Sequence, residues 1–90
     1  MEYEWIKSVA MISCNFTCIK FYSNFNNIII SNSLPENITS LIFGSDFNQK
    51  IEPNSLPKKL SYLEFGNRFN QKIEPNSLPE KLTTIIFGYS

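Results

Sequence analysis

The sequence contains no histidine and only two cysteines, Cys14 and Cys18, among its 90 residues. Without histidine the chain cannot build a Ser-His-Asp triad or a Cys-His pair, and two cysteines are too few for a four-ligand zinc site. We therefore predict no cofactor and no metal site. Eight basic residues balance eight acidic ones. A neutral chain lacks the basic footprint that neutralises nucleic-acid phosphates or anionic lipids, so we predict neither nucleic-acid nor membrane partners.

Long hydrophobic runs are also absent. The stretch from Val9 to Ile12 and the triplet from Ile28 to Ile30 are far shorter than the roughly 20 residues that span a bilayer. A signal peptide begins with basic residues, whereas this sequence has acidic residues at positions 2 and 4, so we predict no signal peptide. Cys14 and Cys18 are four residues apart, so in an extended chain their Cα atoms would lie about 13 Å from each other, and only a helix would bring them within bridging distance. These features favour a reducing, cytosol-like compartment.

Glycine is scarce, and all three glycines (Gly44, Gly66 and Gly88) stand 22 residues apart. The prolines follow the same period, with Pro35, Pro57 and Pro79 in one series and Pro53 and Pro75 in another. Residues 32–53 and 54–75 agree at 14 of 22 positions, and residues 76–90 begin a third, truncated copy. Residues 10–31 fit the same frame as a degenerate copy, and residues 1–9 form a lead-in or cap. A fixed period of this length predicts a solenoid.

Within one repeat, the alternation Leu63-x-Phe65 predicts a short strand with one buried face. Gly66 follows, and we expect it to supply a sharp bend with positive φ. Pro75 and Pro79 in the return segment exclude a regular helix there. We predict strands near residues 17–21, 39–43, 61–65 and 83–87 that pair in parallel.

The string Leu-Pro-x-x-Leu-x-x-Leu-x-Phe-Gly-x-x-Phe-Asn-Gln-x-Ile, present at residues 34–51 in a close variant and at residues 56–73, resembles the FNIP repeat. This family is related to the leucine-rich repeats and is known mainly from amoebae and the giant DNA viruses that infect them. The resemblance implies a β-rich, leucine-rich-repeat-like solenoid with little helix and a protein-binding role. Because we find neither a signal peptide nor a membrane-spanning segment in the sequence, we expect the protein in the cytoplasm, which is the host cytoplasm if the protein is viral.

Some repeated positions have a structural interpretation. The column Phe25, Phe47 and Phe69 predicts core packing. The column Asn26, Asn48 and Asn70 predicts buried amides that hydrogen bond to adjacent coils. Like charges repeat at Lys50 and Lys72 and at Glu52 and Glu74, which predicts a solvated edge.

The eight differences between residues 32–53 and 54–75 all fall between positions 36/58 and 46/68, around the strand. If Leu63 and Phe65 point inward, the outer face presents Cys18, Ser40, Tyr62 and Thr84 in one column and Lys20, Ile42, Glu64 and Ile86 in the next. A rigid scaffold that presents varied residues is what a binding face requires. Relaxed drift on a solvated face would produce the same pattern. The partner-binding candidates are Lys20, Ile42, Asp46, Tyr62, Glu64, Arg68 and Ile86.

Other functions have less support. Catalysis by Glu64 with Lys20 would need two groups roughly 10 Å apart to cooperate, and Cys18 would need activation, so we predict that the chain is not an enzyme. The last strand, from Thr83 to Phe87, offers an edge that could recruit a second chain. A truncated remnant without a function of its own is the remaining alternative.

Overall fold

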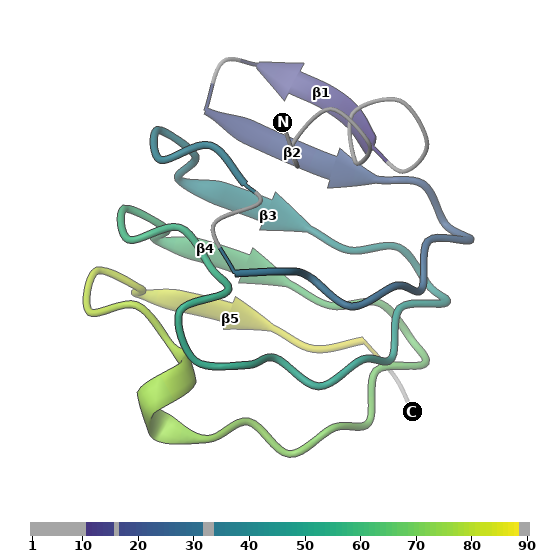
Figure 1. The fold of residues 1–90 in the computed structure, drawn as a ribbon. Helices are drawn as coiled ribbons and strands as arrows, with labels where there is room; N and C mark the ends of the chain where they lie inside the picture. The colour runs from purple at the N-terminus through teal and green to yellow at the C-terminus, as the bar shows by residue number, and fades with distance from the viewer. Residues whose placement is uncertain (1–10, 16, 32–33, 89–90) are drawn as a thin grey trace.

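The computed structural model describes residues 11–15, 17–31 and 34–88. Its strands are β1 (Met11–Asn15), β2 (Cys18–Phe21), β3 (Ser40–Ile42), β4 (Tyr62–Glu64) and β5 (Thr84–Ile86), and a 3₁₀ helix, η1 (Pro75–Ser77), precedes β5. The strands form one sheet in the order β1-β2-β3-β4-β5. The sheet is one layer, and the return segments run across it as a second layer (Figure 1). The predicted β-rich solenoid with little helix is confirmed.

The 22-residue period of the sequence is the register of the sheet. Ser40 pairs with Tyr62, and Tyr62 pairs with Thr84, so each strand residue lies beside the residue 22 positions later in the sequence. The pairs β2-β3, β3-β4 and β4-β5 are parallel, as predicted. The regular strands are shorter than the five residues expected, because the chain turns directly after the phenylalanine that follows each one. We refer to each 22-residue turn of the chain as a coil.

The N-terminal strand was not predicted. β1 pairs with β2 in the antiparallel direction, with Met11 opposite Phe21 and Ser13 opposite Ile19. The chain therefore enters the sheet through a hairpin, and the parallel array begins at β2. The predicted lead-in at residues 1–9 lies outside the described residues.

The core consists of apolar columns that run along the stack. Within the described residues, fifteen buried side chains form one cluster, and each column takes the same repeat position from successive coils. Phe47 is fully buried, and its ring stacks on Phe25 at 5.9 Å and on Phe69 at 6.1 Å between centroids. This confirms the predicted core column. A second phenylalanine column lies beside it, with Phe43 stacked 4.0 Å from Phe47. Such pairs add about 0.5–1.5 kcal/mol beyond their buried area.

The glycines have a different role from the one predicted. None of them has a positive φ. A Cβ placed on Gly44 would lie 2.5 Å from Ser23 Cα, and one on Gly66 would lie 2.6 Å from Ser45 Cα. Both distances are far below the 3.5–4.0 Å at which carbon atoms pack. Glycine is present here because the backbones of adjacent coils touch, and the expectation of a left-handed bend was wrong.

The asparagine column holds successive coils together. Asn48 N–H donates to Asn26 Oδ1 at 2.8 Å, and Asn70 N–H donates to Asn48 Oδ1 at the same distance. The side-chain amide of Gln49 also donates to two oxygens of Asn26. Gln49 Nε2 lies 3.1 Å from the backbone carbonyl oxygen of Asn26 and 3.1 Å from Asn26 Oδ1. The hydrogen bonding is as predicted, but the burial is not, because Asn26 and Asn70 are exposed at the rim of the coil.

Candidate functional site

The outward face of the parallel sheet carries five of the seven predicted binding residues. The strand register places Lys20, Ile42, Glu64 and Ile86 side by side in one column, and Tyr62 lies in the neighbouring column. Ile42, Tyr62 and Glu64 are half-buried, whereas Lys20 and Ile86 are exposed. The inward neighbours Leu41 and Leu63 are fully buried, so the strands alternate as predicted. We refer to these five residues as the sheet-face patch.

The central feature of the patch is a hydrogen bond between two of its side chains. Tyr62 Oη donates to Glu64 Oε1 at 2.6 Å. The bond stabilises the protonated phenol, and partial burial and the negative charge of Glu64 act in the same direction, so the pKa of Tyr62 is raised above its ordinary value of 10.0. At neutral pH, Tyr62 is therefore a fixed donor and Glu64 a charged acceptor whose second oxygen can bind a partner.

Two aliphatic side chains flank the Glu64 carboxylate. Ile42 lies on the strand before it and Ile86 on the strand after it, in register. Adjacent strands are about 4.8 Å apart, so the two isoleucines stand about 10 Å from each other with the carboxylate midway. The patch thus offers an acidic group between two apolar ones, with the Lys20 ammonium one strand beyond Ile42.

Cys18 lies in the predicted column beside Ser40, but it is not exposed there. It is only 8% exposed and is disulfide-bonded. The chain's other cysteine, Cys14, belongs to β1, which the hairpin folds back beside β2. The expectation that an extended chain keeps the cysteines apart was wrong, because it assumed that the chain runs straight between them. Cys18 does not offer a thiolate nucleophile in this state.

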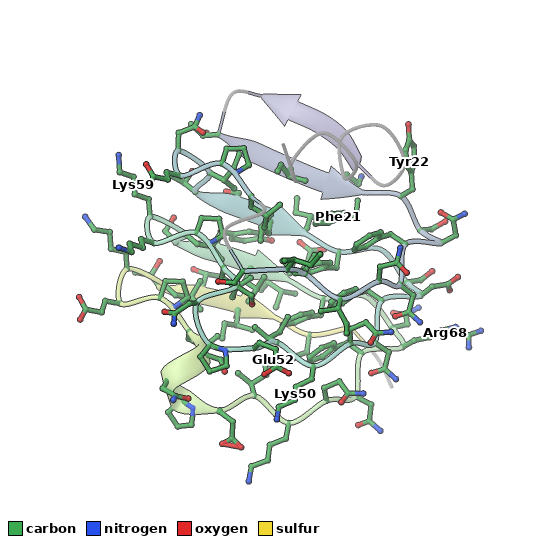
Figure 2. All side chains as sticks on the ribbon, in the orientation of Figure 1. Phe21, Tyr22, Lys50, Glu52, Lys59 and Arg68 are labelled. Carbon is green, nitrogen blue, oxygen red and sulfur yellow. The ribbon has the colours of Figure 1, made fainter. Side chains whose placement is uncertain are left out.

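The remaining two candidates, Asp46 and Arg68, lie at the rim beyond the glycines. Arg68 Nε and Asp46 Oδ1 are 3.5 Å apart, and the two side chains are 74% and 48% exposed. An ion pair this exposed contributes little to stability. Figure 2 shows Arg68 projecting from the edge of the coil stack, away from the packed interior.

These two residues line a shallow groove that the sequence analysis did not identify. Its volume is about 760 Å³, and its other lining residues are all asparagines: Asn24, Asn26, Asn48, Asn67 and Asn70. The sequence signal was the alternation of polar residues around Phe25, Phe47 and Phe69, which places polar side chains on both sides of each inward ring. The structure thus divides the seven candidates between the sheet-face patch and this rim groove.

The return segments carry charged side chains at an exposed edge. Lys50 and Glu52 are exposed, and the equivalent pair in the next coil lies within 3.8 Å, measured from Lys72 Nζ to Glu74 Oε1. Figure 2 shows Lys50 and Glu52 on the layer in front of the sheet. The predicted solvated edge is therefore present. Among the described residues, no three cysteine or acidic side chains gather in a group that could hold a metal ion.

Comparisons with known proteins agree with this architecture. A family model described as the FNIP Repeat matches residues 11–46, 25–68 and 47–90. A crystal structure of CroV588, a giant-virus protein described as a novel circular LRR protein structure, superimposes with a TM-score of 0.75 at 53% sequence identity. The match covers 78% of this chain and 10% of that one, so this chain spans about a tenth of its relative's length. No curated protein matches the sequence.

Proposed function

This chain belongs to the FNIP repeat family, and we propose that it is a non-catalytic interaction module that binds a partner protein through the sheet-face patch. The observation that carries the proposal is where the coils differ. Residues 47–57 and 69–79 have the same sequence, whereas the outward strand positions change from Ser40 and Ile42 to Tyr62 and Glu64. The scaffold is constant, and its exposed face varies.

The composition of the patch supports this role. Tyrosine and aliphatic side chains at the centre of an exposed surface are typical anchors of protein interfaces. The rigid parallel sheet holds them at fixed spacing, so little side-chain freedom is lost on binding. A complementary partner would place a cation or hydrogen-bond donor against Glu64 and apolar groups against Ile42 and Ile86.

Site-specific photo-crosslinking tests the proposal. We would replace Tyr62 with p-benzoylphenylalanine, irradiate the protein in a cell lysate, and identify the products by mass spectrometry. Lys50 on the opposite layer gives the matched control position. We expect one partner to crosslink at position 62 and not at position 50.

A double variant provides the second measurement. Tyr62→Ala combined with Glu64→Ala should reduce retention of that partner at least tenfold, whereas Lys50→Ala combined with Glu52→Ala should leave it unchanged. Both variants should melt within a few degrees of the parent, because neither removes a core side chain. Equal crosslinking at positions 62 and 50, or full retention by the sheet-face variant, would refute the proposal.

A further inference from the structure

The rim groove is lined by two columns of polar side chains that run along the coil stack. The 22-residue register places Asn24, Asp46 and Arg68 in one column and Asn26, Asn48 and Asn70 in the other, and Asn67 completes the lining. The volume of about 760 Å³ lies within the range of about 300–1,000 Å³ that is usual for small-molecule sites. Because every lining residue is polar, the groove suits a ligand that is polar along its whole length.

The asparagine column forms a row of fixed hydrogen-bond donors. Asn26 Oδ1 accepts bonds from Asn48 N–H at 2.8 Å and from Gln49 Nε2 at 3.1 Å. Asn48 Oδ1 accepts the equivalent two bonds, from Asn70 N–H and Gln71 Nε2, at the same distances. These bonds identify the oxygen end of each amide and hold it in place. Within the described residues, neither Asn26 Nδ2 nor Asn48 Nδ2 donates a bond, so both N–H groups of each amide are available to a ligand.

The spacing of these donors is set by the stacking of the coils. Adjacent strands are about 4.8 Å apart, and the rings of Phe25 and Phe47, which lie beside the asparagine column, are 5.9 Å apart. The groove therefore presents equivalent amide donors at a regular repeat of about 5–6 Å.

The facing column leaves the groove without net charge. Asp46 Oδ1 lies 3.5 Å from Arg68 Nε, and the other lining residues are uncharged asparagines. An anionic ligand would meet the Asp46 carboxylate and a cationic ligand would meet the Arg68 guanidinium, so the groove favours a neutral ligand. One contact uses only part of the capacity of either group, because a guanidinium has several donors and a carboxylate has several acceptor sites.

We propose that the rim groove binds a neutral saccharide chain that lies along the coil stack. Sugar hydroxyl groups both donate and accept, so each ring accepts bonds from the asparagine amides on one side and donates to Asp46 on the other. An extended β-1,4-linked chain repeats its rings at a spacing close to that of the coils, so successive rings meet successive asparagines. A peptide fits less well, because the aromatic and aliphatic anchors of peptide interfaces would meet only polar side chains here.

The two columns have different roles in this recognition. The asparagine column is the same in all three coils, so it binds what every ring has in common. The facing column changes from Asn24 to Asp46 to Arg68, so it distinguishes the substituents of successive rings. All of the lining residues lie between positions 24 and 70. The groove is separate from the sheet-face patch, and its test does not depend on the partner proposed above.

Titration followed by ¹H–¹⁵N NMR tests the proposal, because the side-chain amide signals report on the donor groups themselves. Cellotetraose, N-acetylchitotetraose and mannotetraose are suitable neutral β-1,4-linked probes. We expect at least one of them to shift the side-chain amide signals of Asn26 and Asn48 until the shift saturates. The amide signals of Asn54 and Asn76, which lie outside the groove, should stay in place. Inorganic phosphate is the charged comparison and should cause no saturable shift.

Two double variants show whether the facing column takes part. Asp46→Ala combined with Arg68→Ala should weaken saccharide binding at least tenfold and leave the protein folded, because so exposed an ion pair adds little stability. Lys72→Ala combined with Glu74→Ala removes a similarly exposed pair outside the groove and should leave the affinity unchanged.

Four results would overturn the proposal. These are the absence of a saturable shift with all three saccharides, equal shifts at Asn54 and Asn76, equal affinity in the two double variants, and saturable shifts with phosphate but not with a saccharide.

Discussion

Replacing Gly66 with alanine tests why each strand of this solenoid is followed by glycine. The added Cβ would lie 2.6 Å from Ser45 Cα and closer still to Gly44 O, both backbone atoms of the preceding coil. Carbon atoms pack at about 3.5–4.0 Å, so the two coils must separate locally by about 1 Å. The neighbouring bond from Arg68 N–H to Ser45 O, now 3.1 Å long, would be broken.

The cost can be worked out from these contacts. Overpacking against a rigid neighbour costs about 1–3 kcal/mol, and the lost hydrogen bond costs about 1 kcal/mol. Alanine returns about 0.4–1 kcal/mol by restricting the unfolded chain. We expect Gly66→Ala to lower the free energy of unfolding by about 1–3.5 kcal/mol, which is a fall in Tm of about 5–25 °C for a domain of this size.

Urea and thermal unfolding followed by circular dichroism would measure this loss. A second substitution separates close approach from backbone strain. Asparagine tolerates positive φ better than alanine does, so Gly66→Asn would be the milder change if the glycine supplied a left-handed bend. Because the obstacle is contact with the coil behind, we expect Gly66→Asn to be at least as harmful as Gly66→Ala. Asn54, with a φ of 67°, provides the control, and there Gly should be tolerated better than Ala. A Gly66→Ala protein as stable as the parent would refute the reasoning.

Three further predictions concern single polar groups. Asn48→Ala should lower the free energy of unfolding by about 1–3 kcal/mol because it removes an acceptor used by the next coil, and Asn48→Asp, which keeps that acceptor, should cost less by urea titration. Ser55→Ala should cost about 0.5–1.5 kcal/mol because it loses a 2.8 Å bond to a backbone carbonyl. Ser77→Ala should be neutral or stabilising in the same assay, because its buried hydroxyl has no hydrogen-bond partner among the described residues. The phenolate absorbance of Tyr62, isolated by difference from Tyr62→Phe, should titrate above pH 10, and its pKa should fall in Glu64→Gln.

The sign of the tyrosine effect also determines how stability depends on pH. The folded pKa of Tyr62 is raised above the unfolded value, so its hydrogen bond to Glu64 contributes fully at neutral pH and is lost as the pH rises through the folded pKa. Tyr62→Phe should therefore weaken the alkaline loss of stability and leave the behaviour between pH 6 and 8 unchanged. An identical alkaline unfolding profile in the variant would contradict this assignment. Equal costs for Ser55→Ala and Ser77→Ala would contradict the prediction about the two buried serine hydroxyls.

Much of the architecture could be predicted because the same local sequence pattern occurs in several repeats. One Leu63-x-Phe65 alternation would be weak evidence for a strand, but its recurrence at one fixed spacing predicts parallel pairing and the register together. The hairpin formed by β1 was not predicted because residues 11–15 lack the Leu-Pro of the other copies and pair with β2 in the antiparallel direction, which the repeat does not encode. The cysteine prediction failed for the same reason. The rim groove was missed because its residues belong to different coils and form one surface only after the coils stack.

The sequence by itself determined the period, the strand positions, the inward columns and the face on which the coils vary. Only the tertiary structure decided what identical segments do in different surroundings. The hexapeptide Glu-Pro-Asn-Ser-Leu-Pro occurs at residues 52–57 and 74–79. In the first copy Asn54 is left-handed and its carbonyl accepts a bond from Ser31 Oγ, whereas in the second the chain forms η1. The residue equivalent to Ser31 is there Pro53, which has no donor to offer. The neighbouring coil, and not the segment's own residues, selects the conformation.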